Sequence, residues 1–313
     1  PAAARDPCCR PSPGSGWGRI RLERGDAPKR RQTDRMTALL LDVVTTAAIL
    51  FAVASGLLLV FGVMKIINFA HGGLITLGGY AALITTQLGL NPWFGIPMAA
   101  LFGAVAGTLI ERIVVRPLYA RPLDAILATW GLGIIIGQTI VLVFGREVQF
   151  AAAPLGGTID LLGESYSLYR IVMVPIAILL GLGIALLLNG TRLGLATRAV
   201  IMNEDLARGL GIDSTWVRFV TFALGSALAA VAGALITPLS SVDPNMGVPW
   251  LVNAFMLVLV SGTSLASLAA ACLVLGGAQV IVSSLYSPVL GGITIALLAA
   301  IILRTRPQGF ARG

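Results

Sequence analysis

Residues 39–63 read LLLDVVTTAAILFAVASGLLLVFGV, an apolar stretch in which Asp42 is the one ionisable residue. A helix needs about 20 mostly apolar residues to cross the hydrocarbon core of a membrane. This stretch is long enough for that crossing and carries too little charge for a surface helix of a soluble domain. The segment therefore predicts a membrane-spanning helix.

Eight further apolar runs follow it. We expect an all-α protein, a polytopic membrane helix bundle with about eight to ten transmembrane or re-entrant helices. The second, seventh, eighth and ninth runs are short for a full crossing, and broken helices are tolerated where they line a cavity within the protein. In chain order the runs lie at residues 39–63, 74–88, 93–115, 123–144, 171–188, 219–239, 250–260, 268–282 and 289–303.

The composition excludes several other classes. Of 313 residues, 57% are hydrophobic and 12% charged, whereas soluble domains carry about 25% charged residues. His71 is the only histidine, and Cys272 stands apart from Cys8 and Cys9, so we expect no metal site, no cofactor and no disulfide framework. The net charge of +8 is concentrated in residues 1–35, and the body lacks the basic clusters with interleaved aromatics that bind nucleic acid.

Residues 1–35 differ from the rest of the chain. They are rich in Pro, Gly and Arg and lack apolar periodicity, which is typical of disorder. We expect a disordered leader, with Met36 as the true start and residues 36–313 as the transmembrane domain. The alternative is a genuine basic tail that touches anionic lipid.

The basic residues of the body predict its orientation. Arginines cluster in three regions, at residues 112–121, 192–218 and 304–312. These regions fall on one side if the third to ninth runs alternate across the membrane, and the positive-inside rule assigns that side to the cytoplasm. The long loop 145–170, which carries only Arg146 and Arg170 as basic residues, then lies outside. Simple alternation also places the N-terminus outside.

Polar residues interrupt the apolar sequence between the first and second runs, where residues 65–73 read KIINFAHGG. Asn68 suits a helix cap, and Gly72 and Gly73 suit a broken backbone. One interpretation is a capped break at the membrane surface. The other places Asn68, His71 and Gly72 on a solute pathway, because amide and imidazole groups can hydrogen-bond a polar solute.

The loop 190–218 is long for a connection within a helix bundle. Its centre predicts a short helix, with Asn203 as N-cap and with Glu204 and Asp205 at the positive helix end. Leu206, Ala207 and Leu210 form an apolar strip. A short amphipathic helix on the cytoplasmic side suits docking to a partner, and the alternative is a solvated helix on the membrane surface.

Glycines recur in the runs as G-x-x-x-G pairs, at Gly103 with Gly107 and at Gly133 with Gly137. Such pairs favour close packing of membrane helices. A phosphate-binding loop of the pattern G-x-x-x-x-G-K-[ST] is absent, because the only lysines, Lys29 and Lys65, lie in other contexts. The chain therefore lacks this means of holding ATP.

Four motifs in order resemble one family. They are IINFAHGGLITLGGY at 66–80, RPLYARPLDAILATWGLG at 116–133, GLATRAVIMNEDLARGLGID at 194–213 and RTRPQGF at 304–310. Together they resemble the LivH-type permease subunits of ATP-binding-cassette importers for branched-chain amino acids and for urea or short amides. The resemblance spans about residues 39–310.

The resemblance implies a multi-pass permease of the inner (plasma) membrane that forms the translocation pathway and has no enzymatic activity of its own. It implies four kinds of partner: a second related permease, two cytoplasmic ATP-binding subunits, a periplasmic solute-binding protein and membrane lipid. It also implies that Glu204, Asp205, Leu206, Ala207, Arg208 and Gly211 couple the chain to the ATP-binding subunits. The alternative is a stand-alone channel or secondary carrier for a small polar solute.

Overall fold

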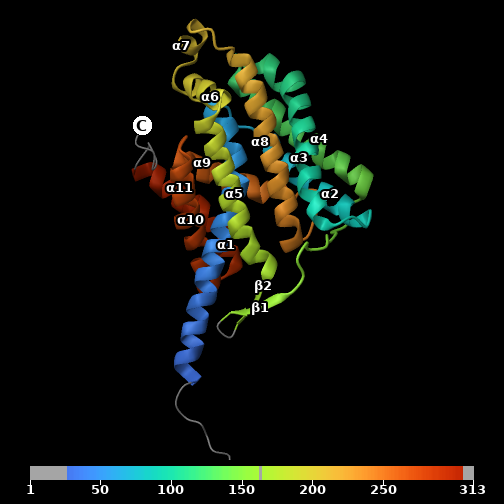
Figure 1. Cartoon of the computed structure of the whole chain (residues 1–313), viewed down its shortest axis with the longest axis vertical. Helices are drawn as coiled ribbons and strands as arrows, with labels where there is room; N and C mark the ends of the chain where they lie inside the picture. The colour runs from blue at the N-terminus through green and yellow to red at the C-terminus, as the bar shows by residue number, and fades with distance from the viewer. Residues whose placement is uncertain (1–26, 162–163, 306–313) are drawn as a thin grey trace, which may run out of the picture.

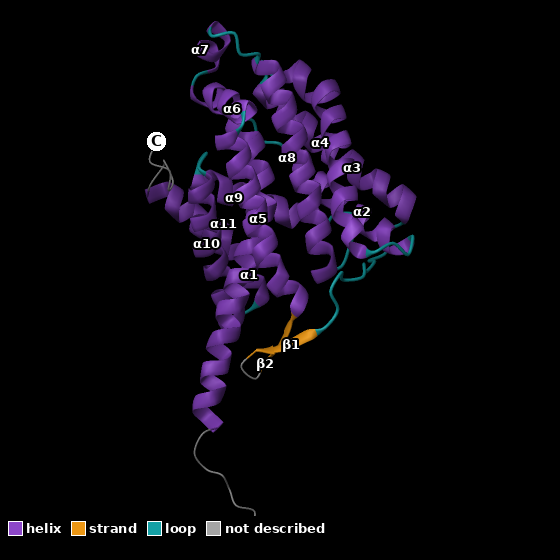
Figure 2. Cartoon of the chain, viewed as in Figure 1, coloured by secondary structure: helices purple, strands orange, loops and turns teal. Residues whose placement is uncertain are grey.

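The computed structural model describes residues 27–161 and 164–305, which form a bundle of α-helices with one small β-hairpin (Figures 1 and 2). Each of the nine apolar runs coincides with a helix, which confirms the predicted all-α membrane fold. The elements are α1 (Ala27–Met64), α2 (Ala70–Gln87), α3 (Gly95–Ile110), α4 (Pro122–Phe144), β1 (Thr158–Leu161), β2 (Glu164–Ser167), α5 (Leu168–Gly190), α6 (Arg192–Met202), α7 (Glu204–Gly209), α8 (Ser214–Ile236), α9 (Gly247–Ser261), α10 (Leu265–Leu285) and α11 (Pro288–Thr305).

Seven helical segments of the described chain are long and apolar enough to cross a membrane. They correspond to α1, α3, α4, α5, α8, α10 and α11, so the eighth and ninth runs are long enough after all. The second and seventh runs form the exceptions, α2 and α9. Helix α9 has 15 residues and is about 22 Å long at 1.5 Å per residue, which is less than the thickness of the hydrocarbon core.

Helix α8 packs against α1, α2 and α3 in the middle of the bundle (Figure 1). The pair Gly103 and Gly107 of α3 makes one of these contacts, because a Cβ at Gly103 would lie 2.6 Å from the carbonyl oxygen of Ser226. The second pair behaves differently: the atoms nearest to a Cβ at Gly133 and Gly137 of α4 would lie 3.5 and 3.6 Å away. Close helix packing therefore requires glycine at Gly103 of the first pair, but it does not require glycine at Gly133 or Gly137.

The basic loops gather at one end of the bundle. Helices α6 and α7 form this end in Figure 1, and the β-hairpin and the start of α1 lie at the opposite end. The turn after α3 lies at the same end, because the ring centroid of Tyr119 is 4.7 Å from the guanidinium of Arg218, near the start of α8. We call it the basic end, and the positive-inside rule assigns it to the cytoplasm.

The start of α1 differs from the sequence prediction. The helix begins at Ala27, so residues 27–35, which we expected to be disordered, are helical. Residues 1–26 of the expected leader lie outside the described residues, as do Arg306 and Arg312. Helix α1 begins at the end opposite the basic end (Figure 1), as simple alternation predicts.

The β-hairpin was not predicted. Strands β1 and β2 pair antiparallel, from Thr158 opposite Ser167 to Leu161 opposite Glu164. The Tyr166 hydroxyl donates a hydrogen bond to Asp42 Oδ1 of α1 at 2.7 Å, and Arg170 forms an ion pair with the same oxygen at 3.0 Å. Asp42 therefore serves to attach the hairpin to α1.

Candidate solute pathway and docking segment

Helix α2 begins inside the bundle. His71 is 0% exposed, and its Nε2 hydrogen-bonds the carbonyl oxygen of Val53 in α1 at 3.2 Å. Val53 precedes the end of α1 at Met64 by eleven residues, which places it about 16 Å below that end. The chain therefore turns back from the basic end toward the middle of the bundle before α2 starts.

Asn68 stabilises this start. Its Oδ1 accepts a hydrogen bond from the Ala70 backbone N–H at 3.1 Å, although Phe69 is the residue in the N-cap position. Asn68 is 3% exposed, and neither its Nδ2 nor the Nδ1 of His71 has a hydrogen-bond partner in the described chain. The predicted polar cluster is therefore a buried helix start within the bundle.

A cavity of about 280 Å³ lies beside this helix start, between α2, α4 and α9. Gly72 lines it, whereas Asn68 and His71 do not. The rings of Phe69 and Trp130 stack at one side with centroids 5.7 Å apart. The remaining lining residues are Gly73, Thr76, Gly133, Ile134, Pro244, Asn245, Val248, Leu251 and Val252.

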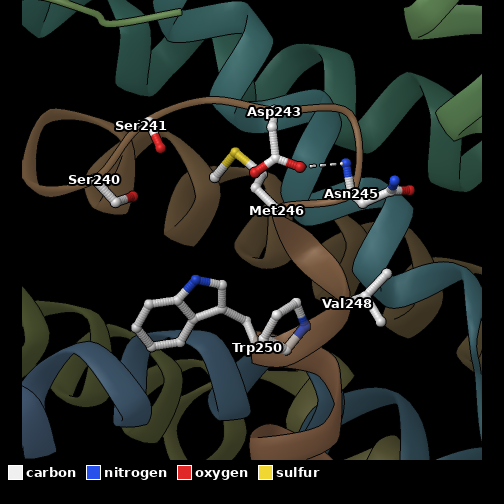
Figure 3. Close-up of a pocket in the computed structure, with 8 residues that line it drawn as sticks. Ser240, Ser241, Asp243, Asn245, Met246, Val248 and Trp250 are labelled. Atoms are coloured by element: carbon white, nitrogen blue, oxygen red, sulfur yellow. Dashed lines mark hydrogen bonds between the residues drawn. The ribbon is translucent and has the colours of Figure 1, made fainter. Parts of the chain in front are cut away.

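A second hollow of about 550 Å³ opens where α8 passes into α9, and we call it the vestibule (Figure 3). It shares Asn245 and Val248 with the cavity, so the two hollows adjoin. The Asp243 carboxylate accepts a hydrogen bond from the Asn245 backbone N–H at 2.9 Å, and Trp250 lies across the vestibule from them. Ser240, Ser241, Met246 and Pro249 complete the lining.

Sequence reasoning missed the vestibule. Its signal was the segment SSVDPN at 240–245, a polar turn sequence between two apolar runs. In the structure this segment is anchored by a two-way backbone pairing between Val242 and Gln149, with N–O distances of 2.8 and 2.9 Å. The loop after α4 therefore holds residues 240–245, which we call the vestibule loop, in place.

The predicted short helix is present as α7. Asn203 caps it, because its Oδ1 accepts a hydrogen bond from the Leu206 N–H at 3.0 Å. The apolar strip is divided: Ala207 is 2% exposed and packs in a cluster with Val63 and other apolar residues, whereas Leu206 and Leu210 are 63% and 74% exposed. The outward apolar surface of α7 thus consists of the two leucines.

The remaining predicted docking residues have different environments. Asp205 is exposed, and Gly211 has a positive φ of 83° that favours glycine. Glu204 forms ion pairs with Arg208, at 2.8 Å, and with Arg218 of α8. Glu204 and Arg208 thus make contacts within the chain, and the docking role of all these residues stays a prediction.

Tyr119 connects the ion pairs of Glu204, Arg208 and Arg218 to the end of α3. Its ring lies under the Arg218 guanidinium, and its hydroxyl donates a hydrogen bond to Glu111. Burial raises the pKa of the Tyr119 hydroxyl, and the bond to Glu111 adds to the rise, so the hydroxyl remains a donor. Glu111 is fully buried and opens a π-helical turn, Glu111–Val115, at the end of α3.

Multiple membrane-spanning helices, a cavity between α2, α4 and α9, and a basic end with an exposed short helix define a multi-pass membrane permease. The chain belongs to the family described as "Branched-chain amino acid transport system / permease component", whose model matches residues 39–304. It is therefore an inner-membrane permease subunit of an ATP-binding-cassette transport system, and the stand-alone carrier is not favoured.

Known proteins agree with this assignment. The chain is 30% identical to the probable branched-chain amino acid transport permease protein LivH of Methanocaldococcus jannaschii, over 68% of this chain and 70% of that protein. It is 27% identical to the high-affinity branched-chain amino acid transport system permease protein BraD of Pseudomonas aeruginosa, over 86% and 94% of the two chains. A solved structure, PsaBC from Streptococcus pneumoniae in complex with Fab, shares the fold with TM-score 0.50 and 14% identity, covering 90% of this chain and 96% of that one.

Proposed function

We propose that this permease carries a branched-chain amino acid through the cavity between α2, α4 and α9, and that α7 docks a separate ATP-binding subunit. One observation supports this choice of solute: the cavity has a mostly apolar lining, whereas the adjoining vestibule contains the carboxylate of Asp243. The names of the relatives support the same solute class. Urea and short amides are the competing solutes.

The apolar lining of the cavity favours an aliphatic side chain. Leu251, Val252 and Ile134 present hydrocarbon to the space, together with the Phe69 and Trp130 rings. Burial of a valine-sized or leucine-sized side chain gains about 1.5–3 kcal/mol relative to water. Urea has no hydrocarbon to bury and gains nothing comparable here.

Asp243 supplies the complementary polar contact. Among the described residues that line the vestibule, it is the one ionisable side chain. A carboxylate attracts an ammonium group and repels another carboxylate, so a zwitterionic amino acid would bind with its ammonium group nearer to Asp243 than its own carboxylate. A branched-chain amino acid has an ammonium group next to an aliphatic side chain. The ammonium group would lie in the vestibule near Asp243, and the side chain would lie in the adjoining cavity.

A second permease subunit would complete this pathway. Trp130, Ile134, Val248 and Val252 line the cavity and are also exposed on the chain itself. A polar solute facing lipid on that side would lose its hydrogen-bond partners at a cost of several kcal/mol. We therefore place a related permease against the α4 and α9 side of the cavity.

The other partners follow from the two ends of the bundle. ATP hydrolysis belongs to two separate subunits on the cytoplasmic side, because neither Lys29 nor Lys65 lies in a phosphate-binding loop. A periplasmic solute-binding protein would deliver its cargo at the vestibule end.

The variant Asp243→Asn tests the solute assignment. It removes the charge and keeps an oxygen that can accept the hydrogen bond from Asn245. Hydrogen bonds to charged groups contribute about 1.5–3 kcal/mol, so we expect leucine uptake at low concentration to fall at least about tenfold. The measurement is uptake of labelled leucine by cells that express the complete transporter and lack other leucine importers.

Glu147→Gln is the matched control, because Glu147 is an exposed acidic residue in the loop that holds the vestibule. We expect it to leave leucine uptake unchanged. Competition by excess unlabelled urea, combined with full leucine uptake by Asp243→Asn, would contradict the proposed solute.

A further inference from the structure

Helix α8 connects the two functional ends of the chain. Its first turn, at Ser214, lies next to α7, and its last turn leads through Thr237–Leu239 into the vestibule loop. A displacement of α8 at the basic end would therefore reach the vestibule directly.

Close backbone contacts make α8 part of a rigid unit. A Cβ at Gly225 would lie 2.8 Å from the carbonyl oxygen of Gly56 in α1, and one at Gly233 would lie 1.9 Å from that of Ile75 in α2. Interiors packed this tightly have low compressibility and transmit strain. We treat α8 and the helices against it as one body when α7 is displaced.

Arg218 joins α7 to this body. Its side chain is only 15% exposed and forms an ion pair with Glu204 of α7. The same guanidinium covers the ring of Tyr119, whose hydroxyl reaches the buried Glu111 at the end of α3. One side chain of α8 thus contacts the docking helix and the turn that follows α3.

We propose that Arg218 is the positioning residue that transmits displacement of α7 to α8 and α3, so that events at the ATP-binding subunit change the vestibule. The inference rests on the proposed docking role of α7. The planar guanidinium suits this position, because it can pair with a carboxylate and stack on an aromatic ring at the same time. Loss of Arg218 leaves the outward leucines of α7 in place and removes the ion pair behind them, whereas the hydrogen bond from Arg208 to the Ser214 hydroxyl of α8 remains.

The test compares Arg218→Gln with wild type in the complete transporter, reconstituted in proteoliposomes with its ATP-binding subunits and solute-binding protein. We expect the ATP-binding subunits to co-purify normally and ATP hydrolysis to stay within about twofold of wild type. Solute moved per ATP hydrolysed is expected to fall about tenfold. Arg218→Lys, which keeps the charge and loses the stacked plane, should restore this ratio in part.

Arg192→Gln is the matched control, since Arg192 is an exposed arginine at the start of α6, and it should keep the wild-type ratio. Tyr119→Phe removes only the hydroxyl that donates to Glu111. If Arg218→Gln does not fold, solute moved per ATP hydrolysed is measured for Tyr119→Phe instead. A proportional loss of hydrolysis and transport, or an unchanged ratio in both Arg218→Gln and Tyr119→Phe, would overturn the proposal. Failure of the ATP-binding subunits to bind wild-type chain would instead contradict the proposed function.

Discussion

Replacement of Gly78 by alanine is expected to destabilise the folded permease strongly. A Cβ at this position would lie 1.9 Å from the carbonyl oxygen of Ala230 in α8, and neither backbone can move without disturbing the other helices. Overpacking in a core costs about 1–3 kcal/mol and occasionally more, so we expect a loss of about 3 kcal/mol. The measurement is the thermal unfolding midpoint of the purified protein in detergent, together with its yield from membranes.

Gly131→Ala provides the control for this prediction. Gly131 lies within α4, and no atom beyond the local helix backbone lies within 4 Å of the position its Cβ would take. Alanine there removes backbone freedom without a clash, so the midpoint should be unchanged or slightly higher. Equal midpoints for the two variants would show that α2 and α8 do not approach each other as described.

Replacement of Leu206 by aspartate is expected to weaken binding of the ATP-binding subunit strongly and to leave the permease folded. Leu206 is exposed and makes no part of the bundle core, so the chain should insert and purify as wild type. Docking would bury the leucine, and a carboxylate in its place loses that burial and is left unpaired. We expect a loss of about 3 kcal/mol, roughly a hundredfold in affinity, measured by titration of the ATP-binding subunit onto purified permease.

Leu195→Asp is the matched control, because Leu195 is a leucine of α6 at the same end with 64% exposure, against 63% for Leu206. We expect little change in affinity for this variant. If both variants bind the ATP-binding subunit as wild type does, α7 is not the docking helix.

The sequence predicted most of the helical architecture because the signal for it is local. A helix satisfies its backbone hydrogen bonds within one segment, which apolar surroundings require, so the nine runs and their helices agree. The α7 helix was predictable for the same reason, since the cap at Asn203 depends on contacts within four residues. The hairpin escaped prediction because the Tyr166–Asp42 contact joins residues far apart in the sequence.

The site was less predictable, because the direction of a side chain depends on which helices touch. Gly72 lines the cavity, whereas the neighbouring His71 faces Val53 of α1, and no periodicity distinguishes these two positions. Ala207 and Leu206 likewise belong to one apolar strip in the sequence, but in the structure Ala207 is buried and Leu206 is exposed. Asp243 was missed because a single acidic residue in a turn is common, and only the fold places it at a cavity.

The central claim is that α7 and the vestibule lie on opposite sides of the membrane, with α7 in the cytoplasm. It can be tested with Leu206→Cys and Ser240→Cys, each in a chain whose Cys8 and Cys9 are replaced by serine and whose Cys272 is replaced by alanine. A membrane-impermeant maleimide added to spheroplasts should label the Ser240→Cys variant at once and the Leu206→Cys variant only after the membrane is permeabilised. Labelling of the Leu206→Cys variant in sealed spheroplasts would contradict the account.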